Sequence, residues 1–457
     1  MTRSIMVGGA IAIVLVLLAL GAVRWLRNHG FDRATAPSPA ITASTVPVAS
    51  EGDQGFLFGR LVTNDGDTYE GRIRWGGDAE AFWGDYFNGY KDKNPWAAYV
   101  PSEQMKKSRP IKIFGLEIAH RESQIALDRP FMVRFGDIAR IEPDNRYVRV
   151  TLKSGTVFLL NRSDASDFDD GIRVWDGNRG IVDFDAGRIR SIEFLHSGWP
   201  GTVSDRLHGT VHTRQGDFTG FVQWDRQECI GSDELKGRTA TGELRLRFDA
   251  IRSIARNSRD SVLVTLLDGR EIVLSDTRKV GSDNRGIYVD DPRYSRVLVS
   301  WDAFERVDFT PGGNSPAYDD FPPGYPLMGT VTTFAGRRLS GRLVYDLDES
   351  ETTDTLDAPL QGVNYTIPFG MIFSIVFAGP EERGAQRARV TLHSGEELQL
   401  ECTGDLRDGN AGILIFADGR ERPEYVRWTE VAQVEFDRPP SMYPPLSRAR
   451  SITAADG

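Results

Sequence analysis

Apolar and polar residues alternate in short runs along most of the chain after about residue 55. At residues 148–152 and 262–266, every second position is apolar, which is the period of a half-buried β-strand. Turn dipeptides follow runs of this kind, as Asp65-Gly66, Ser154-Gly155 and Asp268-Gly269 do, and glycine tolerates the positive φ of a tight hairpin. No segment beyond Arg33 has a long amphipathic helical pattern, so the sequence predicts an all-β protein.

One pattern occurs three times. It begins as GRLVTNDGDTYEGRIRWG at Gly59, as GTVHTRQGDFTGFVQWD at Gly209 and as GTVTTFAGRRLSGRLVYD at Gly329. In each copy the first two glycines lie seven residues apart and a third follows four or five residues later. Self-similarity of this kind is typical of tandem repeats, each of which folds into a similar unit.

Further elements follow in the same order in every copy. A Phe-x-x-Ile-x-x-Ile segment starts at Phe135, Phe248 and Phe369, and a closing strand ends at Phe194, Phe309 and Phe436. We therefore predict repeats at 55–198, 206–310 and 325–437, with an aromatic-rich insertion at 77–134 in the first. Residues 438–457 are predicted to form a disordered tail.

Each repeat contains two halves, and both run from a glycine-turn hairpin to a short I-x-x-I strand. This arrangement resembles the Sm-like and SH3-like small β-barrels, at fold level and over most of the chain after Gly55. The resemblance implies two five-stranded barrels per repeat, while one β-sandwich of about ten strands remains an alternative. The RNA-contacting residues of the Sm family have no match here, so no function is transferred.

The N-terminus predicts a membrane anchor. Residues 4–23 are uncharged and long enough to cross a bilayer as a helix, and residues 34–54 form a linker rich in Pro, Ala, Ser and Thr. Small residues at 19–22 leave a cleaved signal peptide as an alternative. We expect a single-pass inner-membrane protein with its repeats on the extracytoplasmic side. The arginines that follow the helix favour the opposite, cytoplasmic orientation.

Charge and motif content narrow the function. A net charge of −10 argues against nucleic acid as a partner. His208 and His212 lie four residues apart in a predicted strand, too far apart to bind one zinc ion together. The chain has two cysteines, Cys229 and Cys402, at non-equivalent positions of their repeats. It carries no nucleophile-elbow, zincin or phosphate-loop motif. We predict no catalytic residues, no cofactor and no metal site.

Aromatic residues are dense in the first-repeat insertion, and they are the binding residues that we predict from the sequence: Phe82, Trp83, Tyr86, Phe87, Tyr90, Trp96 and Tyr99. Aromatic faces with polar edges suit sugars, peptides and apolar protein surfaces. The alternative is that these side chains pack the insertion onto the first repeat.

An acidic pair recurs in the loop after the first hairpin of each repeat: Glu80 and Asp85, Glu228 and Asp233, Glu349 and Asp354. Carboxylates at this spacing suit a hard cation such as calcium. The interpretation that we favour is structural, with the Asp accepting backbone hydrogen bonds that hold the loop.

We therefore expect a non-enzymatic, membrane-anchored binding or scaffold module of a bacterial-type envelope, with a protein or glycan partner. Two alternatives stay open: an envelope hydrolase that uses carboxylates and the insertion as its pocket, and a cytoplasmic-facing protein that self-assembles through barrel edges as a homo-oligomer.

Overall fold

The computed structural model describes residues 55–76, 79–100, 106–113, 116–124, 130–162, 168, 171–196, 205–275, 277–312, 315–378 and 387–441, with the backbone alone for 106–124. The predicted membrane helix at 4–23 and linker at 34–54 lie outside these residues. So does the predicted tail, except for residues 438–441.

The described part of the chain is all-β, as the sequence predicts. Every named element is a β-strand or a three-residue 3-10 turn, and the strands form three large sheets and two separate two-stranded sheets. Within the described residues, no helix has the length and apolar character that crossing a bilayer requires.

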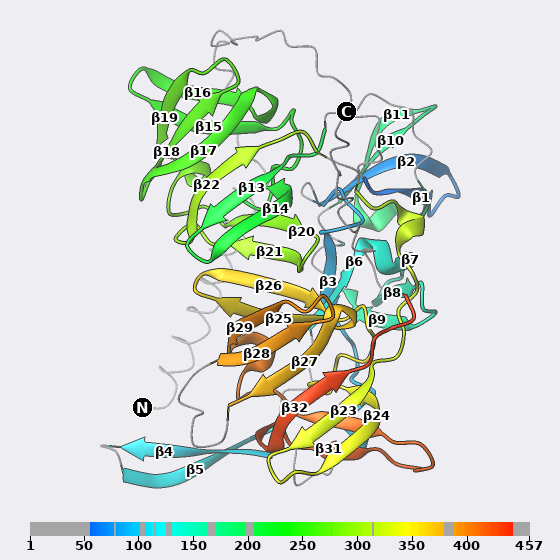
Figure 1. The fold of residues 1–457 in the computed structure, drawn as a ribbon. Coiled ribbons are helices and arrows are strands. Elements are labelled where there is room, and N and C mark those ends of the chain that lie inside the picture. Colours follow the sequence, from blue (N-terminus) through cyan, green and yellow to red (C-terminus); the bar gives the residue numbers. More distant parts are fainter. Residues whose placement is uncertain are drawn as a thin grey trace, which may run out of the picture. The chain divides into compact units, whose positions relative to one another are not determined.

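The first repeat forms an eight-stranded sheet with the order β11-β10-β2-β1-β12-β7-β8-β9 (Figure 1). Its strands are β1 (Phe58–Thr63), β2 (Thr68–Trp75), β7 (Ile138–Pro143), β8 (Tyr147–Leu152), β9 (Val157–Asn161), β10 (Ile172–Asp176), β11 (Gly180–Phe184) and β12 (Ile189–Phe194). A two-stranded sheet, β3 (Tyr86–Tyr90) with β6 (Pro130–Arg134), and the hairpin of β4 (Lys106–Ile113) with β5 (Leu116–Gln124) complete it.

The third repeat has the same strand order, β31-β30-β24-β23-β32-β27-β28-β29. Its strands are β23 (Met328–Thr333), β24 (Arg338–Val344), β27 (Ile372–Phe377), β28 (Arg387–Leu392), β29 (Glu397–Glu401), β30 (Ile413–Phe416), β31 (Glu424–Val426) and β32 (Val431–Phe436).

The second repeat supplies the same eight-strand order within a twelve-stranded sheet. Its strands are β13 (His208–Thr213), β14 (Gly216–Gln223), β17 (Ile251–Ser258), β18 (Ser261–Leu266), β19 (Glu271–Ser275), β20 (Ile287–Asp291), β21 (Ser295–Val299) and β22 (Phe304–Phe309), with β15 (Glu234–Thr239) and β16 (Gly242–Arg247) added at one end. At the other end the sheet takes in β25 (Thr355–Leu360) and β26 (Val363–Pro368) of the third repeat, and β26 lies beside β21 (Figure 1).

The recurrent glycines have a steric cause. A Cβ at Gly71 would lie 1.9 Å from the carbonyl oxygen of Trp175, and one at Gly220 would lie 2.0 Å from that of Asp290. These distances are far below van der Waals contact, so the pairing of β2 with β10, and of β14 with β20, admits no side chain there. Gly66 instead has φ +94 in the turn between β1 and β2, with open space around it.

The first-repeat insertion begins later than the sequence predicts. β3 and β6 pair in the same way as β15 with β16 and β25 with β26, so both strands belong to the common repeat. In the other repeats this hairpin closes through short turns around Ala240 and Gln361. The residues particular to the first repeat are therefore 91–129, which join β3 to β6, rather than 77–134.

Candidate functional site

Four of the seven predicted binding aromatics are buried, three of them in the core of the first repeat and Tyr86 where this repeat meets Ser295 of the second. Phe82 is 1% exposed, Trp83 2%, Tyr86 5% and Phe87 0%. These four side chains pack within the protein, as the alternative interpretation of the aromatic residues expects. The hairpin of β3 and β6 is part of the repeat framework, and its inward side chains fill the core as those of the other repeats do.

Phe87 shows this equivalence directly. It stands two residues after the loop Asp, as Leu235 and Leu356 do, and all three side chains are 0% exposed. The ring of Phe87 packs edge-on against Trp75 with centroids 5.3 Å apart. The apolar position after the acidic pair is thus a core position in every repeat.

The other three aromatics lie at or beyond the end of β3, and two of them reach the third repeat. The segment 91–100 is attached there by Lys91, whose ammonium lies 2.6 Å from the Asp348 carboxylate. The Asn94 side-chain amide also donates to the carbonyl oxygen of Leu347 at 2.9 Å. Tyr90 is 50% exposed at the end of β3.

Trp96 and Tyr99 form a surface cluster with the third repeat, here called the aromatic patch: Trp96, Tyr99, Phe416 and Arg342. The Phe416 ring lies 5.8 Å from Trp96 and 5.5 Å from Tyr99, edge-on in both cases. The Arg342 guanidinium lies over Trp96 at 5.2 Å. Tyr99 remains 45% exposed, while Trp96 and Phe416 are partly exposed.

Buried residues under the patch fix its position. Val100, Val344, Leu347, Ala411 and Leu414 form a small core of their own, against which Trp96 and Phe416 pack. A cation over an aromatic ring, beside exposed rings held in place from below, is a frequent composition of protein and ligand contacts. Sequence reasoning missed Arg342 and Phe416 because they come from β24 and β30 and approach the extension only in the folded chain.

The recurrent Asp residues fix the loops. The Asp85 carboxylate accepts backbone N–H bonds from Glu80 at 2.8 Å and Ala81 at 2.9 Å. Asp233 and Asp354 each accept two backbone bonds in the same way, at 2.7 to 3.2 Å. These contacts match the structural interpretation of the pairs. In the described part of the chain, no group of three His, Cys, Asp or Glu side chains is placed to hold a metal ion.

The Glu residues of the pairs are less alike than the sequence suggests. Glu228 bridges to Trp224 and Glu349 to Tyr345, but in the first repeat Ala79 takes this place opposite Trp75. Glu80 is therefore shifted by one position. It is 1% exposed and forms ion pairs with Arg72 and Arg74.

Glu228 and Glu349 are equivalent, yet the neighbouring residue is a lysine in the second repeat and an aspartate in the third. Glu228 pairs with the Lys279 ammonium, whereas Asp405 occupies the position of Lys279 in the third repeat. The equivalence follows from shared contacts: the carbonyl oxygens of Lys279 and Asp405 accept from Asn284 at 3.0 Å and Asn410 at 2.9 Å.

Burial and neighbouring carboxylates strongly raise the pKa of two carboxyl groups in this region of the third repeat. Burial, followed by the Asp357 and Asp346 carboxylates, raises the pKa of Asp405 to about 8. Burial and the Asp348, Asp405 and Asp346 carboxylates raise the pKa of Glu349 well above its ordinary value. At neutral pH the Asp405 carboxyl is therefore largely protonated.

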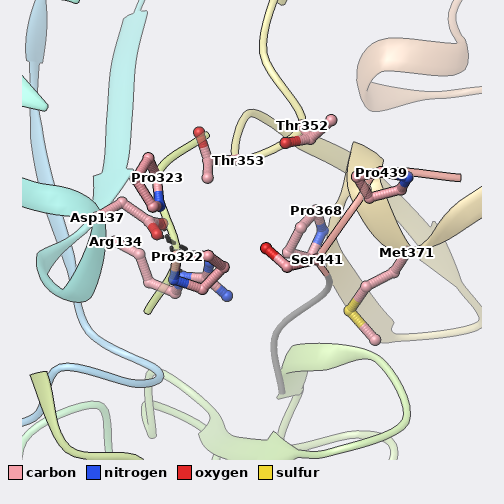
Figure 2. A pocket seen from close by; sticks show the side chains of 11 residues that line it. Arg134, Asp137, Pro322, Pro323, Thr352, Thr353, Pro368, Met371, Pro439 and Ser441 are labelled. Carbon is pink, nitrogen blue, oxygen red and sulfur yellow. Dashed lines mark hydrogen bonds and ion pairs between the residues drawn. The ribbon is translucent and has the colours of Figure 1, made fainter. Parts of the chain in front are cut away.

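A separate, small cleft lies between the first repeat, the 315–325 linker and the third repeat, with a volume of about 30 Å³ (Figure 2). Figure 2 shows Arg134, Asp137 and Pro322 on one side and Pro368, Met371 and Pro439 on the other. The Arg134 Nε and a terminal nitrogen donate to the two Asp137 carboxylate oxygens at 2.9 and 3.2 Å.

Linker residues hold this cleft together. Phe321 is 2% exposed within the first repeat's core, and the Tyr318 hydroxyl donates to the carbonyl oxygen of Ile138 at 2.9 Å. The Lys153 ammonium lies 3.5 Å from the Tyr318 ring centroid, and burial lowers the pKa of Lys153 to about 8. The cleft thus has proline walls beside the Arg134–Asp137 ion pair, and its composition is that of a contact between packed segments.

His212 lies between two carboxylates, with Nδ1 2.8 Å from Asp217 and Nε2 3.1 Å from Asp308. It lies on the same strand as His208, β13. Cys229 and Cys402 are both free thiols.

Comparisons with known proteins give little guidance. No protein-family model matches the chain, and the search of curated proteins found no match. Among solved structures, a streptogramin B lyase aligns at 11% identity over 66% of this chain and 94% of its own, with a TM-score of 0.11. A virginiamycin B lyase from Staphylococcus aureus aligns at 10% identity over 65% of this chain and 98% of its own, with a TM-score of 0.12. Likeness at these scores supports no conclusion about fold or activity.

Proposed function

We propose that this chain is a membrane-anchored, non-catalytic binding module that presents its aromatic patch to a protein or glycan partner on the extracytoplasmic side of the membrane. The observation that carries the proposal is the exposure of Tyr99. It keeps 45% of its surface in water although its ring packs against Phe416 and a buried core lies beneath the patch. Rigid, amphipathic rings of this kind lose little entropy when a partner covers them.

The repeats serve this function as a support. The extension at 91–100 comes from the first repeat, while Phe416 and Arg342 come from the third, so the patch requires both repeats in place. The predicted anchor and linker at 4–54 would hold the repeats away from the bilayer.

A photo-crosslinking experiment tests the partner. A benzophenone amino acid replaces Tyr99 in the full chain in native membranes, and a matched variant carries it at Val273, which is 47% exposed in the second repeat. A discrete adduct from position 99 and none from position 273 supports a protein partner. Binding to purified peptidoglycan that Tyr99→Ser weakens supports a glycan. If neither the adduct nor the glycan binding depends on position 99, the proposal is wrong.

The membrane placement has its own test. Alkaline phosphatase fused after residue 441 should be active if the repeats are extracytoplasmic, and the protein should resist carbonate extraction. An inactive fusion with an active cytoplasmic reporter at the same point would show the opposite orientation.

We also propose that each repeat is a pair of SH3-like barrels. In the first repeat, β1, β2, β10, β11 and β12 form one set of neighbours and β3, β6, β7, β8 and β9 form the other. A 3-10 turn precedes the strand that ends the first set, at Ala186–Arg188, and precedes β7 in the second, at Phe135–Asp137. An experimental structure of a single repeat in which these sets form two stacked layers of one sandwich would contradict the assignment.

A carboxylate-dependent hydrolase is the second candidate. The pKa of about 8 for Asp405 provides the protonated carboxyl that a general acid needs at neutral pH. Release of soluble fragments from peptidoglycan by the native chain, abolished in Asp405→Asn, would favour the hydrolase over the binding module.

A further inference from the structure

The second and third repeats are joined by strand addition. β21 and β26 pair antiparallel, with Arg296 opposite Thr366, Val297 opposite Tyr365 and Val299 opposite Val363. The apolar side chains along this strand pair are buried, since Val297, Val299 and Val363 are 0% exposed and Tyr365 is 3% exposed. The pair of β21 and β26 therefore shows the register in which two strand edges of this chain fit together.

The same two kinds of edge recur elsewhere in the chain. β11 is the first-repeat equivalent of β21, because Phe184 pairs with Ile172 as Val299 pairs with Ile287. β16 is the second-repeat equivalent of β26, because both strands run into the 3-10 turn that starts at Phe248 or Phe369. Among the described strands, β11 pairs with β10 alone and β16 with β15 alone.

Side-chain exposure shows that these edges are incomplete versions of the existing interface. Val182 and Leu244, which correspond to the buried Val297 and Tyr365, are partly exposed. Ile181, which corresponds to Arg296, is 63% exposed. An apolar side chain this exposed, on an edge that no described strand pairs with, favours the addition of another strand.

We propose that β16 of one copy of this chain adds to β11 of a second copy, antiparallel and in the register of β21 with β26. That register places Ile181 opposite Arg245, Val182 opposite Leu244 and Asp183 opposite Glu243. Each copy carries both edges, and the dimer that we propose is the closed arrangement in which both contacts form about a twofold axis. A contact of this kind that did not close would give an open chain of copies, and that result would contradict the dimer.

The charges in this register set the strength of the contact. Asp183 already binds Arg173, with Nε 2.7 Å from the carboxylate, and Glu243 lies opposite Arg238 across β15 and β16. The pairing therefore creates a row of Arg, Asp, Glu and Arg with two carboxylates adjacent at its centre. Adjacent like charges weaken cross-strand pairs, so Asp183→Asn should tighten the dimer.

The main test introduces a like charge opposite Arg245 and then reverses the charge of residue 245. Ile181→Lys places a second cation opposite Arg245 on a highly exposed side chain, so it should leave folding intact. In sedimentation velocity of the full chain in detergent, we expect a dimer whose dissociation constant rises at least tenfold in Ile181→Lys. Adding Arg245→Glu to that variant should restore the dimer. Val273→Lys, which changes another exposed apolar residue, on β19, is the control and should leave the dimer unaffected.

Two further results overturn the proposal. One is a monomer at every concentration tested. The other is a dimer that Ile181→Lys leaves unchanged, since the copies would then be held elsewhere, for example by the predicted helix at 4–23.

A register test works independently of these variants. Two differently tagged copies carry Ile181→Cys and Arg245→Cys, with Cys402 replaced by serine and the buried Cys229 retained. A mixed disulfide should form under mild oxidation, because opposed strand residues lie within bonding reach. Ile181→Cys with Arg247→Cys is the control, about 7 Å out of register. Equal yields from both pairs would refute the stated register.

The proposed dimer contact contains no residue of the aromatic patch. A dimer that forms while Tyr99 proves irrelevant to any partner would leave the inference standing and remove the proposed function, and the reverse outcome is equally distinguishable.

Discussion

Replacement of Asp405 by asparagine should stabilise the protein, and the gain should depend strongly on pH. With a folded-state pKa of about 8 and an ordinary value near 3.9, Asp405 holds a proton in the folded chain that the unfolded chain has released between about pH 4 and pH 8. Raising the pH through this window therefore favours unfolding, and the stabilisation present at low pH is lost.

The magnitude follows from the same shift. Each pH unit within the window costs about 1.4 kcal/mol, so retaining the proton at pH 7 costs about 4 kcal/mol. The asparagine of the variant would need no proton, and its side-chain oxygen can still accept the Asp357 N–H bond that Asp405 accepts at 2.7 Å. We expect a gain of about 2–4 kcal/mol at pH 7, falling towards zero near pH 4, with the lower figure allowing for relaxation of the neighbouring groups.

Urea unfolding of the full chain, followed by tryptophan fluorescence at pH 5, 6, 7 and 8, measures this gain. Glu228→Gln is the matched control, because it removes the carboxylate from the equivalent pair in the second repeat and leaves Lys279 without its partner. That variant should destabilise the protein at each of these pH values. A stability difference for Asp405→Asn that is the same at pH 5 and pH 8 would refute the reasoning.

Other changes test the framework of the repeats by the same unfolding measurement. Asp354→Ala leaves two buried backbone N–H groups unpaired and should cost about 2–4 kcal/mol; a loss below about 0.5 kcal/mol would show that the carboxylate does not hold the loop. Phe87→Ala should cost about 3–5 kcal/mol, whereas a neutral result would place this ring outside the core. Gly71→Ala should cost at least about 4 kcal/mol because its Cβ meets the Trp175 carbonyl, while Gly66→Ala in the turn should cost about 1 kcal/mol. Equal effects of the two glycine substitutions would contradict the steric account.

The sequence by itself determined the all-β class. Alternating apolar positions and glycine turns specify strands locally, since each residue's preference depends on its nearest neighbours along the chain. The loop role of Asp85 and its equivalents was predictable for the same reason, because an Asp that accepts backbone bonds three to five residues away is a local device.

The tertiary structure decided which aromatic residues are exposed. Phe87 and Tyr99 both lie in the aromatic-rich segment from which the sequence predicts a binding surface. The Phe87 ring packs on Trp75, whereas the Tyr99 ring packs against Phe416 of the third repeat. Burial depends on what covers a residue, and the ring that covers part of Tyr99 belongs to Phe416, which is far away along the chain.

Strand addition was equally beyond the sequence. β21 is covered by β26 while the equivalent edge β11 is not, although the two strands share their register within the repeat. An edge strand's own residues specify how it pairs with the strand beside it in its hairpin. Whether a strand of another repeat or of a second copy pairs with its free edge depends on the position of the whole repeat in the folded protein, which the edge strand's own residues do not specify.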